Sequence, residues 1–296
     1  VAHDVAEAAA DPGAEAGHIA FGLAGLQAKF SMSRGKDRSL VMRGSRGAEA
    51  WIVKTPDAVY PGVAENEYFV SRWARAAGID VPDVNLVPST DLVGLPPHVP
   101  LHDKLAFAIR RFDREDHARI HQEDFAQVIG RPLGHGGKYT GTSFDALAHV
   151  VLVHCGMADW EQYIRRLVFM VACGNADAHL KNWSLRYLNG VDARLSPAYD
   201  LLSTVVYPGH EHEAMALLLN KHSGFTQVSD RSWCRIARLC GMDERQVERQ
   251  ARTSAGAVRA AWRSTVDALA ASLALPDRFV ERVEKHMARI PLLRGV

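Results

Sequence analysis

Hydrophobic and polar residues follow two different periods along the 296-residue chain. In the first part, apolar runs such as SLVMRG, EAWIVKTP, VPDVNLVP and KLAFAIRRF have the length and β-branched content of strands. The first two of these runs predict an antiparallel pair joined around Gly44 and Gly47. Apolar residues recur at helical spacing over 64–77, 143–155, 159–173, 229–241, 243–271 and 276–290. The pattern therefore predicts an α+β chain, with a small strand-rich part before a mostly helical part.

The composition is that of an ordinary globular protein. The chain is 47% hydrophobic and 23% charged with a net charge of +1, so its charge argues neither for nor against a nucleic-acid partner. No apolar run approaches the ~20 residues of a membrane-spanning helix. The four cysteines lack CxxC spacing, which predicts free thiols in a reducing compartment. Residues 1–17 read as an N-terminal arm without the features of a secretory signal, so we expect a cytoplasmic protein.

The stretch GNADAHLKNWSL, followed by SPAYDLLS, carries the main candidate chemistry. Asp177 and Asn182 are five residues apart, and Asp200 follows eighteen residues later. Protein kinases use this order for a catalytic Asp, a magnesium-binding Asn and a second metal-binding Asp. Lys181 adds a cation where phosphoryl charge needs neutralising. The alternative is ordinary turn capping by Asp and Asn.

Two segments of the strand-rich part fit the same chemistry. Lys54 closes the run WIVK, where a kinase lysine contacts nucleotide phosphates, although most lysines at strand ends lie on sheet edges. Glu67, on the predicted helix 64–77, is either the partner of Lys54 or a solvated residue of the first turn. The small residues around AGLQAK suit a loop over phosphates, with Lys29 adding charge, or an ordinary hairpin turn.

Five segments in order, AGLQAK, WIVKTP, RRFDR with HQEDF, GNADAHLKN and PAYDLLS, closely resemble the HipA family of bacterial toxin serine/threonine kinases. The resemblance implies a bilobal protein-kinase-like fold that uses ATP and Mg²⁺. It implies that Asp177 and Lys181 are catalytic and that Asn182 and Asp200 are metal ligands. The nucleotide-binding residues that it implies, besides these two ligands, are Gly25, Gln27, Lys29, Lys54, Arg111, Phe112, Asp113, Gln122 and His179.

The resemblance also implies partners. HipA-like kinases phosphorylate aminoacyl-tRNA synthetases and pair with a helix-turn-helix antitoxin, so DNA would be reached only indirectly and no membrane is involved. HipA itself has a β-rich subdomain ahead of the glycine loop. With about 20 residues before that loop, we expect this sequence to resemble the compact HipT-like branch, in which a separate small protein would supply the N-subdomain. Ser31 and Ser33 follow the loop in an S-x-S pattern similar to that branch, which predicts regulatory autophosphorylation. An ordinary polar turn is the alternative.

These observations lead to one organisation and three competing functions. We expect an N-lobe over 18–113 and a helical C-lobe over 114–296. A small-molecule kinase of the aminoglycoside type is the main alternative, but Asn175 stands where that class has histidine. A non-catalytic pseudokinase is less consistent with the presence of Lys54, Asp177, Asn182 and Asp200 together.

Overall fold

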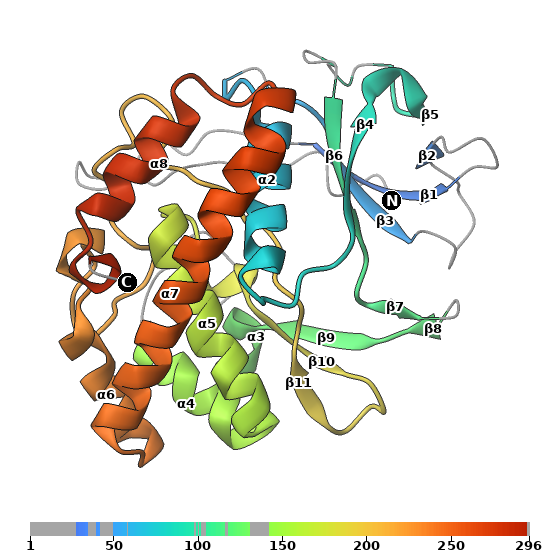
Figure 1. Cartoon of the computed structure of the whole chain (residues 1–296). Helices are drawn as coiled ribbons and strands as arrows, with labels where there is room; N and C mark the ends of the chain where they lie inside the picture. The colour runs from blue at the N-terminus through green and yellow to red at the C-terminus, as the bar shows by residue number, and fades with distance from the viewer. Residues whose placement is uncertain are drawn as a thin grey trace, which may run out of the picture.

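The chain folds into a β-rich lobe and a helical lobe, with the helix α2 (Val63–Ala76) between them (Figure 1). The structure, a computed structural model, describes residues 28–34, 40–41, 50–57, 59–97, 99, 101, 105–115, 118–130 and 142–294. Residues 24–27 of the glycine loop and the N-terminal arm lie outside these residues. In the described part, no helix is long and apolar enough to cross a membrane.

The β-rich lobe is a six-stranded sheet in the order β4-β6-β3-β1-β2-β5. Its strands are β1 (Lys29–Arg34), β2 (Leu40–Val41), β3 (Trp51–Lys54), β4 (Val84–Pro88), β5 (Leu92–Val93) and β6 (Leu105–Arg110). All neighbours are antiparallel except β2 and β5, which are parallel. β3 therefore lies inside the sheet, and Lys54 at its end is not an edge lysine.

The predicted hairpin of SLVMRG and EAWIVKTP is wrong, because β1 lies between β2 and β3. The six residues KFSMSR alternate weakly, with Met32 buried and Ser31 exposed, so a loop was the simpler interpretation of the sequence. The pairing has a consequence for the site, because Lys29 lies directly opposite Lys54.

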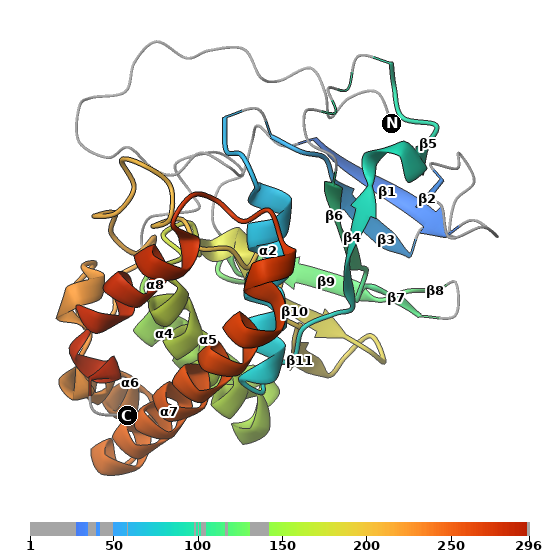
Figure 2. The same ribbon diagram turned by 45° about the horizontal axis from the view of Figure 1, so that its top comes forward.

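The helix α2 joins the two lobes (Figure 2). One side of it packs on the sheet and the other on α7 (Glu244–Leu269). Trp73 lies with its ring centre 4.6 Å from that of Trp262, and its indole N–H donates to the carbonyl of Val258 at 2.8 Å. At the end of α2, Ala76 is exposed and Ala77 is buried.

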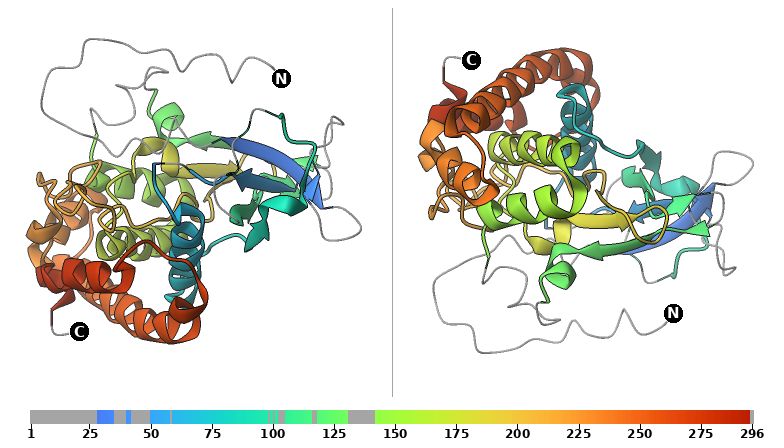
Figure 3. Two further views of the ribbon diagram at one scale, coloured as in Figure 1. Left: turned by 90° about the horizontal axis from the view of Figure 1, so that it is seen from above. Right: turned by 90° about the horizontal axis from the view of Figure 1, so that it is seen from below.

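The helical lobe lies on the opposite side of α2 from the six-stranded sheet (Figure 3). Its other helices are α3 (Phe125–Val128), α4 (Phe144–Cys155), α5 (Met157–Cys173), α6 (Cys234–Cys240) and α8 (Phe279–Ala288). The remaining strands are β7 (Arg114–Glu115), β8 (Ala118–Arg119), β9 (His121–Asp124), β10 (Ser184–Tyr187) and β11 (Ala193–Leu195). β7 pairs with β8, and β11-β10-β9 form a three-stranded sheet. All four cysteines are free thiols, as predicted.

The stretch VVYPGHEHEAMALLLNKHSGF, which follows Asp200, runs as successive turns with isolated bridges between Ser143 and Leu218 and between Leu219 and His222. Pro208 and Gly209 in this stretch favour turns, and Pro208 also removes a backbone donor from any strand. Its first residues, from Val205 onward, pack directly behind the loop that contains Asp177.

Candidate active site

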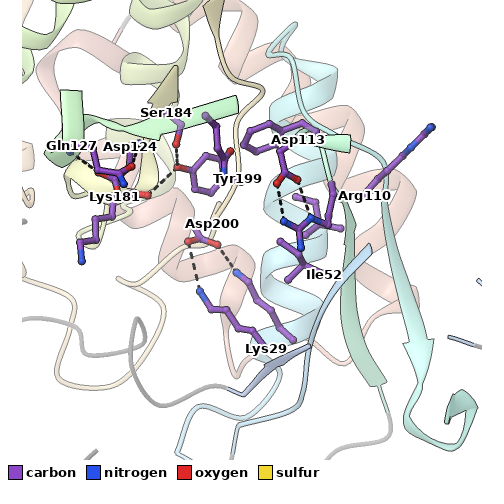
Figure 4. A pocket seen from close by; sticks show the side chains of 15 residues that line it. Lys29, Ile52, Arg110, Asp113, Asp124, Gln127, Lys181, Ser184, Tyr199 and Asp200 are labelled. Atoms are coloured by element: carbon purple, nitrogen blue, oxygen red, sulfur yellow. Dashed lines mark hydrogen bonds and ion pairs between the residues drawn. The ribbon is translucent and has the colours of Figure 1, made fainter. Parts of the chain in front are cut away.

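A cavity of about 430 Å³ opens between the β-rich lobe and the helical lobe. Its size is in the range of small-molecule sites. Apolar walls come from Ile52 and Ile109, and charged groups converge from both lobes (Figure 4). The other described residues that line it are Lys29, Lys54, Arg110, Arg111, Phe112, Asp113, Gln122, Asp124, Gln127, Lys181, Ser184, Tyr199 and Asp200.

Lys54 is the centre of a buried charge network at the base of this cavity. Its ammonium group donates to the carboxylate of Glu67 on α2, and to Asp200 Oδ1 at 2.7 Å. The side chains of Lys54 and Glu67 are only 7% and 3% exposed. Burial acts to lower the pKa of Lys54, but Asp200 and Glu67 outweigh it and raise that pKa above its usual range. Lys54 is therefore a fixed cation that links the sheet, α2 and the helical lobe.

Asp200, which accepts from Lys54 and lines the cavity, has an unusual backbone conformation. Its φ of 53° lies in the left-handed region, which few residues other than glycine adopt. Lys29 lies 3.9 Å from its second oxygen. Burial would raise the pKa of Asp200, but Lys54 and Lys29 hold it well below its usual range. The carboxylate is thus ionised at neutral pH, as a ligand for a hard cation must be.

The loop that contains Asp177 is organised by its own backbone and by Asn182. The loop begins at Gly174, whose φ of 65° ends α5. The amide nitrogen of Asn182 donates to the carbonyl of Asp177 at 2.7 Å, so the two predicted site residues are joined across one turn. His179 Nε2 lies 3.8 Å from Asp177 Oδ1. Asp177, His179 and Asn182 are buried, and none of them belongs to the described lining of the cavity.

Arg166 and Tyr199 hold this loop in place through hydrogen bonds to its backbone carbonyls. Arg166 on α5 is buried, stacks on the Trp183 ring at 4.2 Å and donates to the carbonyl of Asn182 at 2.7 Å. Burial lowers the pKa of Arg166 to about 10, which leaves the group cationic at neutral pH. The Tyr199 hydroxyl donates to the carbonyl of Lys181 at 2.9 Å and shares a 2.6 Å hydrogen bond with Ser184.

Asn66 ties α2 to the chain just beyond Asp200. Its side-chain amide donates to the carbonyl of Ser203 at 2.9 Å and accepts from the N–H of Ser203 at 3.0 Å. Asn66 is fully buried and is next to Glu67, so one turn of helix contacts both Lys54 and the segment after Asp200. A shift of α2 would therefore also move Asp200, through Lys54 and through Ser203.

Arg111 and Asp113 form a second charge cluster at the other end of the cavity. Arg111 makes a bidentate pair with Asp113 at 2.8 and 2.7 Å, and Arg114 Nη1 also lies 2.5 Å from the same carboxylate. The expected contact of Asp113 with a nucleotide therefore competes with two guanidinium groups. Arg111 also donates to Ser31 Oγ at 2.8 Å, which connects this cluster to β1.

Ser31 and Ser33 lie on β1 and not on a loop, which corrects their expected location. The backbone of β1 pairs with both β2 and β3, so the polar side chains sit on a strand and do not form a turn. Ser31 is exposed, whereas Ser33 is only 6% exposed and lies opposite Val41.

Comparison with known proteins agrees with this geometry. The sequence matches the HipA-like C-terminal domain over residues 21–262. The chain belongs to the HipA family. Two curated relatives from Sinorhizobium fredii are named putative kinase Y4dM, 37% identical over 93% of this chain, and putative kinase Y4mE, 33% identical over 74%. The chain spans 66% and 51% of their respective lengths.

A solved structure of HipA from Shewanella oneidensis, in complex with HipB and operator DNA, has the same fold. It matches 92% of this chain and 63% of its own with a TM-score of 0.68 at 20% identity. The predicted bilobal, kinase-like α+β fold of this HipA-family chain is therefore confirmed.

The structure brings most of the predicted site residues together. Lys29, Lys54, Arg111, Phe112, Asp113, Gln122, Lys181 and Asp200 line the cavity. The pairing of Lys54 with Glu67, which the sequence left open, is confirmed. Gly25 and Gln27 lie outside the described residues, so their roles stay predictions.

Sequence reasoning missed the residues that hold the site in place, namely Asn66, Arg166 and Tyr199. The sequence offers a hint for each residue. Asn66 and Arg166 are polar residues among the apolar residues of predicted helices, and Tyr199 directly precedes Asp200. A single polar residue in a helix does not reveal its partner, because that partner comes from a distant segment.

Proposed function

We propose that this HipA-family chain is an ATP-dependent serine/threonine-protein kinase. The observation that carries the proposal is the network in which Lys54 joins Glu67 of α2 to Asp200 beside a cavity of nucleotide size. Kinases need such a lysine–glutamate pair to hold a phosphate-binding cation in place. Ile52 and Ile109 offer apolar surface for a base, and Phe112 stacks against Tyr199 with ring centres 5.5 Å apart.

Mg²⁺ fits the donor set of this site. Asp200 provides an ionised carboxylate, and Asn182 has its amide nitrogen engaged with Asp177, which leaves the amide oxygen as its metal-binding atom. In the described part of the chain no cluster of three His, Cys, Asp or Glu residues could hold a metal by itself. Mg²⁺ typically uses one or two protein ligands together with substrate phosphates, and Asp200 and Asn182 would be those ligands. Bound there, the ion would neutralise charge on the phosphates.

The residues of the catalytic loop would act on the attacking hydroxyl. Asp177 would accept the hydroxyl proton as the new O–P bond forms and the bond to ADP breaks. Lys181, on the cavity lining, would stabilise negative charge on the transferred group. Lys54 and Lys29 would contact the phosphates that remain on ADP.

We further propose that the protein is the toxin of a HipBA- or HipBST-like system. Its substrate would be an aminoacyl-tRNA synthetase, as the family resemblance implies, and phosphorylation would inhibit translation. A helix-turn-helix antitoxin would be its partner, in line with the HipB in the Shewanella complex. A separate N-subdomain-like protein would complete the compact HipT-like arrangement. Autophosphorylation at Ser31 or Ser33 would regulate the enzyme.

Transfer of radioactive phosphate from ATP tests the proposal. The chain should label a synthetase in a panel of purified synthetases, and label no aminoglycoside. Asp177→Gln should abolish transfer and keep ATP affinity within a few-fold, because a base acts mainly in the transition state. Asp200→Ala should lose both transfer and MgATP affinity. Wild-type turnover by the Asp177→Gln variant contradicts the assigned role, and labelling of an aminoglycoside alone favours the small-molecule alternative.

A further inference from the structure

A second cavity, of about 390 Å³, lies between α8 and the segment that follows Asp200. Its lining is mainly charged. The described residues that form it are Val205, Glu211, His212, Arg278, Glu281, Arg282, Lys285, His286 and Arg289. Four cations face two carboxylates, so the net charge is +2 with both histidines neutral. Burial lowers the pKa of His286 to about 4, which keeps that ring neutral.

The excess charge can be assigned to two side chains. Arg278 pairs with Glu281, and Arg282 pairs with Glu211 at 3.1 Å. These pairs use both carboxylates of the lining. Lys285 has no hydrogen bond or ion pair with another described residue.

Arg289 donates both of its terminal nitrogens toward His212 Nδ1, at 3.3 and 3.4 Å, and contacts no carboxylate in the described part of the chain. Lys285 and Arg289 are four residues apart at the end of α8, so they share one face of it. Two cations that form no direct ion pair, on one wall of a cavity, are suitable donors for an oxyanion, and a guanidinium offers phosphate a two-pronged contact.

The cavity borders the catalytic loop directly. His286 Nε2–H donates to the carbonyl of Val171 near the end of α5 at 2.9 Å. A Cβ built on Gly174 would lie 2.5 Å from Val205 and 3.1 Å from His286, both of which line the cavity. Gly174 begins the loop of Asp177, so a ligand that shifts either wall would also shift the loop.

We propose that this second cavity binds a phosphate group through Lys285 and Arg289, and that the bound group orders the loop from Gly174 to Asn182. The ligand is a phosphate monoanion or dianion, either free or attached to a side chain. This site is separate from the first cavity, and its existence does not depend on the kinase activity proposed above.

Isothermal titration of the purified 296-residue chain with inorganic phosphate tests the site. The double variant Lys285→Gln/Arg289→Gln should bind phosphate at least ten-fold more weakly than the wild type. A matched control, Arg249→Gln/Arg263→Gln, removes two exposed cations from α7 and should keep wild-type affinity. Lys285→Arg should retain binding. Equal phosphate affinity in the wild type and the first double variant, or the same loss in the control, overturns the proposal.

Two further measurements identify the source of the phosphate and the coupling. A phosphoserine peptide that binds more tightly than inorganic phosphate assigns the site to a phosphorylated side chain, and the reverse order assigns it to a free ligand. Hydrogen exchange of residues 171–182 should slow when phosphate is added to the wild type and stay unchanged in the Lys285→Gln/Arg289→Gln variant. Unchanged exchange in phosphate-bound wild type contradicts the coupling to the loop.

Discussion

The two cavities of this protein are similar in volume but differ in how their charges are compensated. In the first, Lys54 is enclosed by two carboxylates, and Lys29 adds a more distant contact to one of them. In the second, each carboxylate already has an arginine, and two cations remain. A closed network keeps its geometry without a ligand, whereas excess charge favours a ligand of opposite sign. Removing a cation should therefore destabilise the fold in the first cavity and leave its stability nearly unchanged in the second.

Lys54→Ala should produce the largest effect. It leaves Glu67 buried without its partner, and breaking a buried pair in this way costs about 3–5 kcal/mol of unfolding free energy. Nucleotide affinity should fall ten-fold or more, because a charge-assisted contact to phosphate is lost. Urea unfolding and titration with ATP measure the two quantities.

Two control variants, each of which removes a more weakly paired lysine, should lose much less stability than Lys54→Ala. Lys29 is 42% exposed and 3.9 Å from Asp200, so Lys29→Ala should cost less than about 1 kcal/mol. Lys285→Ala in the second cavity should leave stability within about 0.5 kcal/mol, because no carboxylate loses its partner. If all three variants unfold at the same urea concentration, the charges of the two cavities do not differ in the way described.

The first cavity and the adjacent loop of Asp177 were also the parts of the molecule where the sequence motifs were most informative. Lys54, Asp177, Asn182 and Asp200 lie in short motifs whose spacing reflects kinase chemistry, so one sequence was enough to find them. The pairing of β1 with β3 was missed because six alternating residues give a weak strand signal. The second cavity had no motif, since Val205 and Arg289 are far apart in sequence and meet only through the packing of α8.

His286, in the second cavity, should make the stability of the protein depend on pH. The folded-state pKa of His286 is lowered from 6.5 to about 4, so the unfolded chain binds its proton first as pH falls. Stability from this group is fully present above pH 6.5 and is lost progressively down to pH 4, by about 3 kcal/mol in total. Urea unfolding at several pH values across this window measures the slope.

His286→Gln is the matched variant, because glutamine can still donate to the carbonyl of Val171 but does not titrate. Between pH 4 and pH 6.5 its stability should depend less on pH than that of the wild type. Parallel curves for the two proteins would show that His286 does not contribute the slope.

Asn66→Ala should have an intermediate effect. It removes three hydrogen bonds, two with the backbone of Ser203 and one to the Tyr207 hydroxyl. The N–H and carbonyl of Ser203 are left buried without their side-chain partner, which costs about 1–3 kcal/mol. Because α2 also contains Glu67, we expect activity to fall together with stability. Gln246→Ala, at an exposed position on α7, should leave both within error. A stable Asn66→Ala protein with full activity would show that α2 and Asp200 are not coupled through this contact.

Substitutions of Ser31 should have the smallest effect on activity, and they test the contact of Arg111 with Asp113 at the end of the first cavity. Its hydroxyl accepts from Arg111, which also holds Asp113. A phosphate on Ser31 would compete with Asp113 for Arg111 and loosen the cluster at that end of the cavity. Ser31→Asp should therefore lower phosphate transfer a few-fold, and more than Ser31→Ala does. In an Arg111→Gln background the two Ser31 variants should be equal, because the shared partner is gone.

Mass spectrometry of the active protein and of Asp177→Gln decides whether the chain modifies itself. We expect phosphate on Ser31 in the active protein and none in the variant. Ser33 is 6% exposed and lies opposite Val41, so its modification would require β1 and β2 to separate. Phosphate found only on Ser33 would contradict the Arg111 mechanism, since the side chain that Arg111 contacts is that of Ser31. Equal phosphate in both proteins would mean that another enzyme adds it.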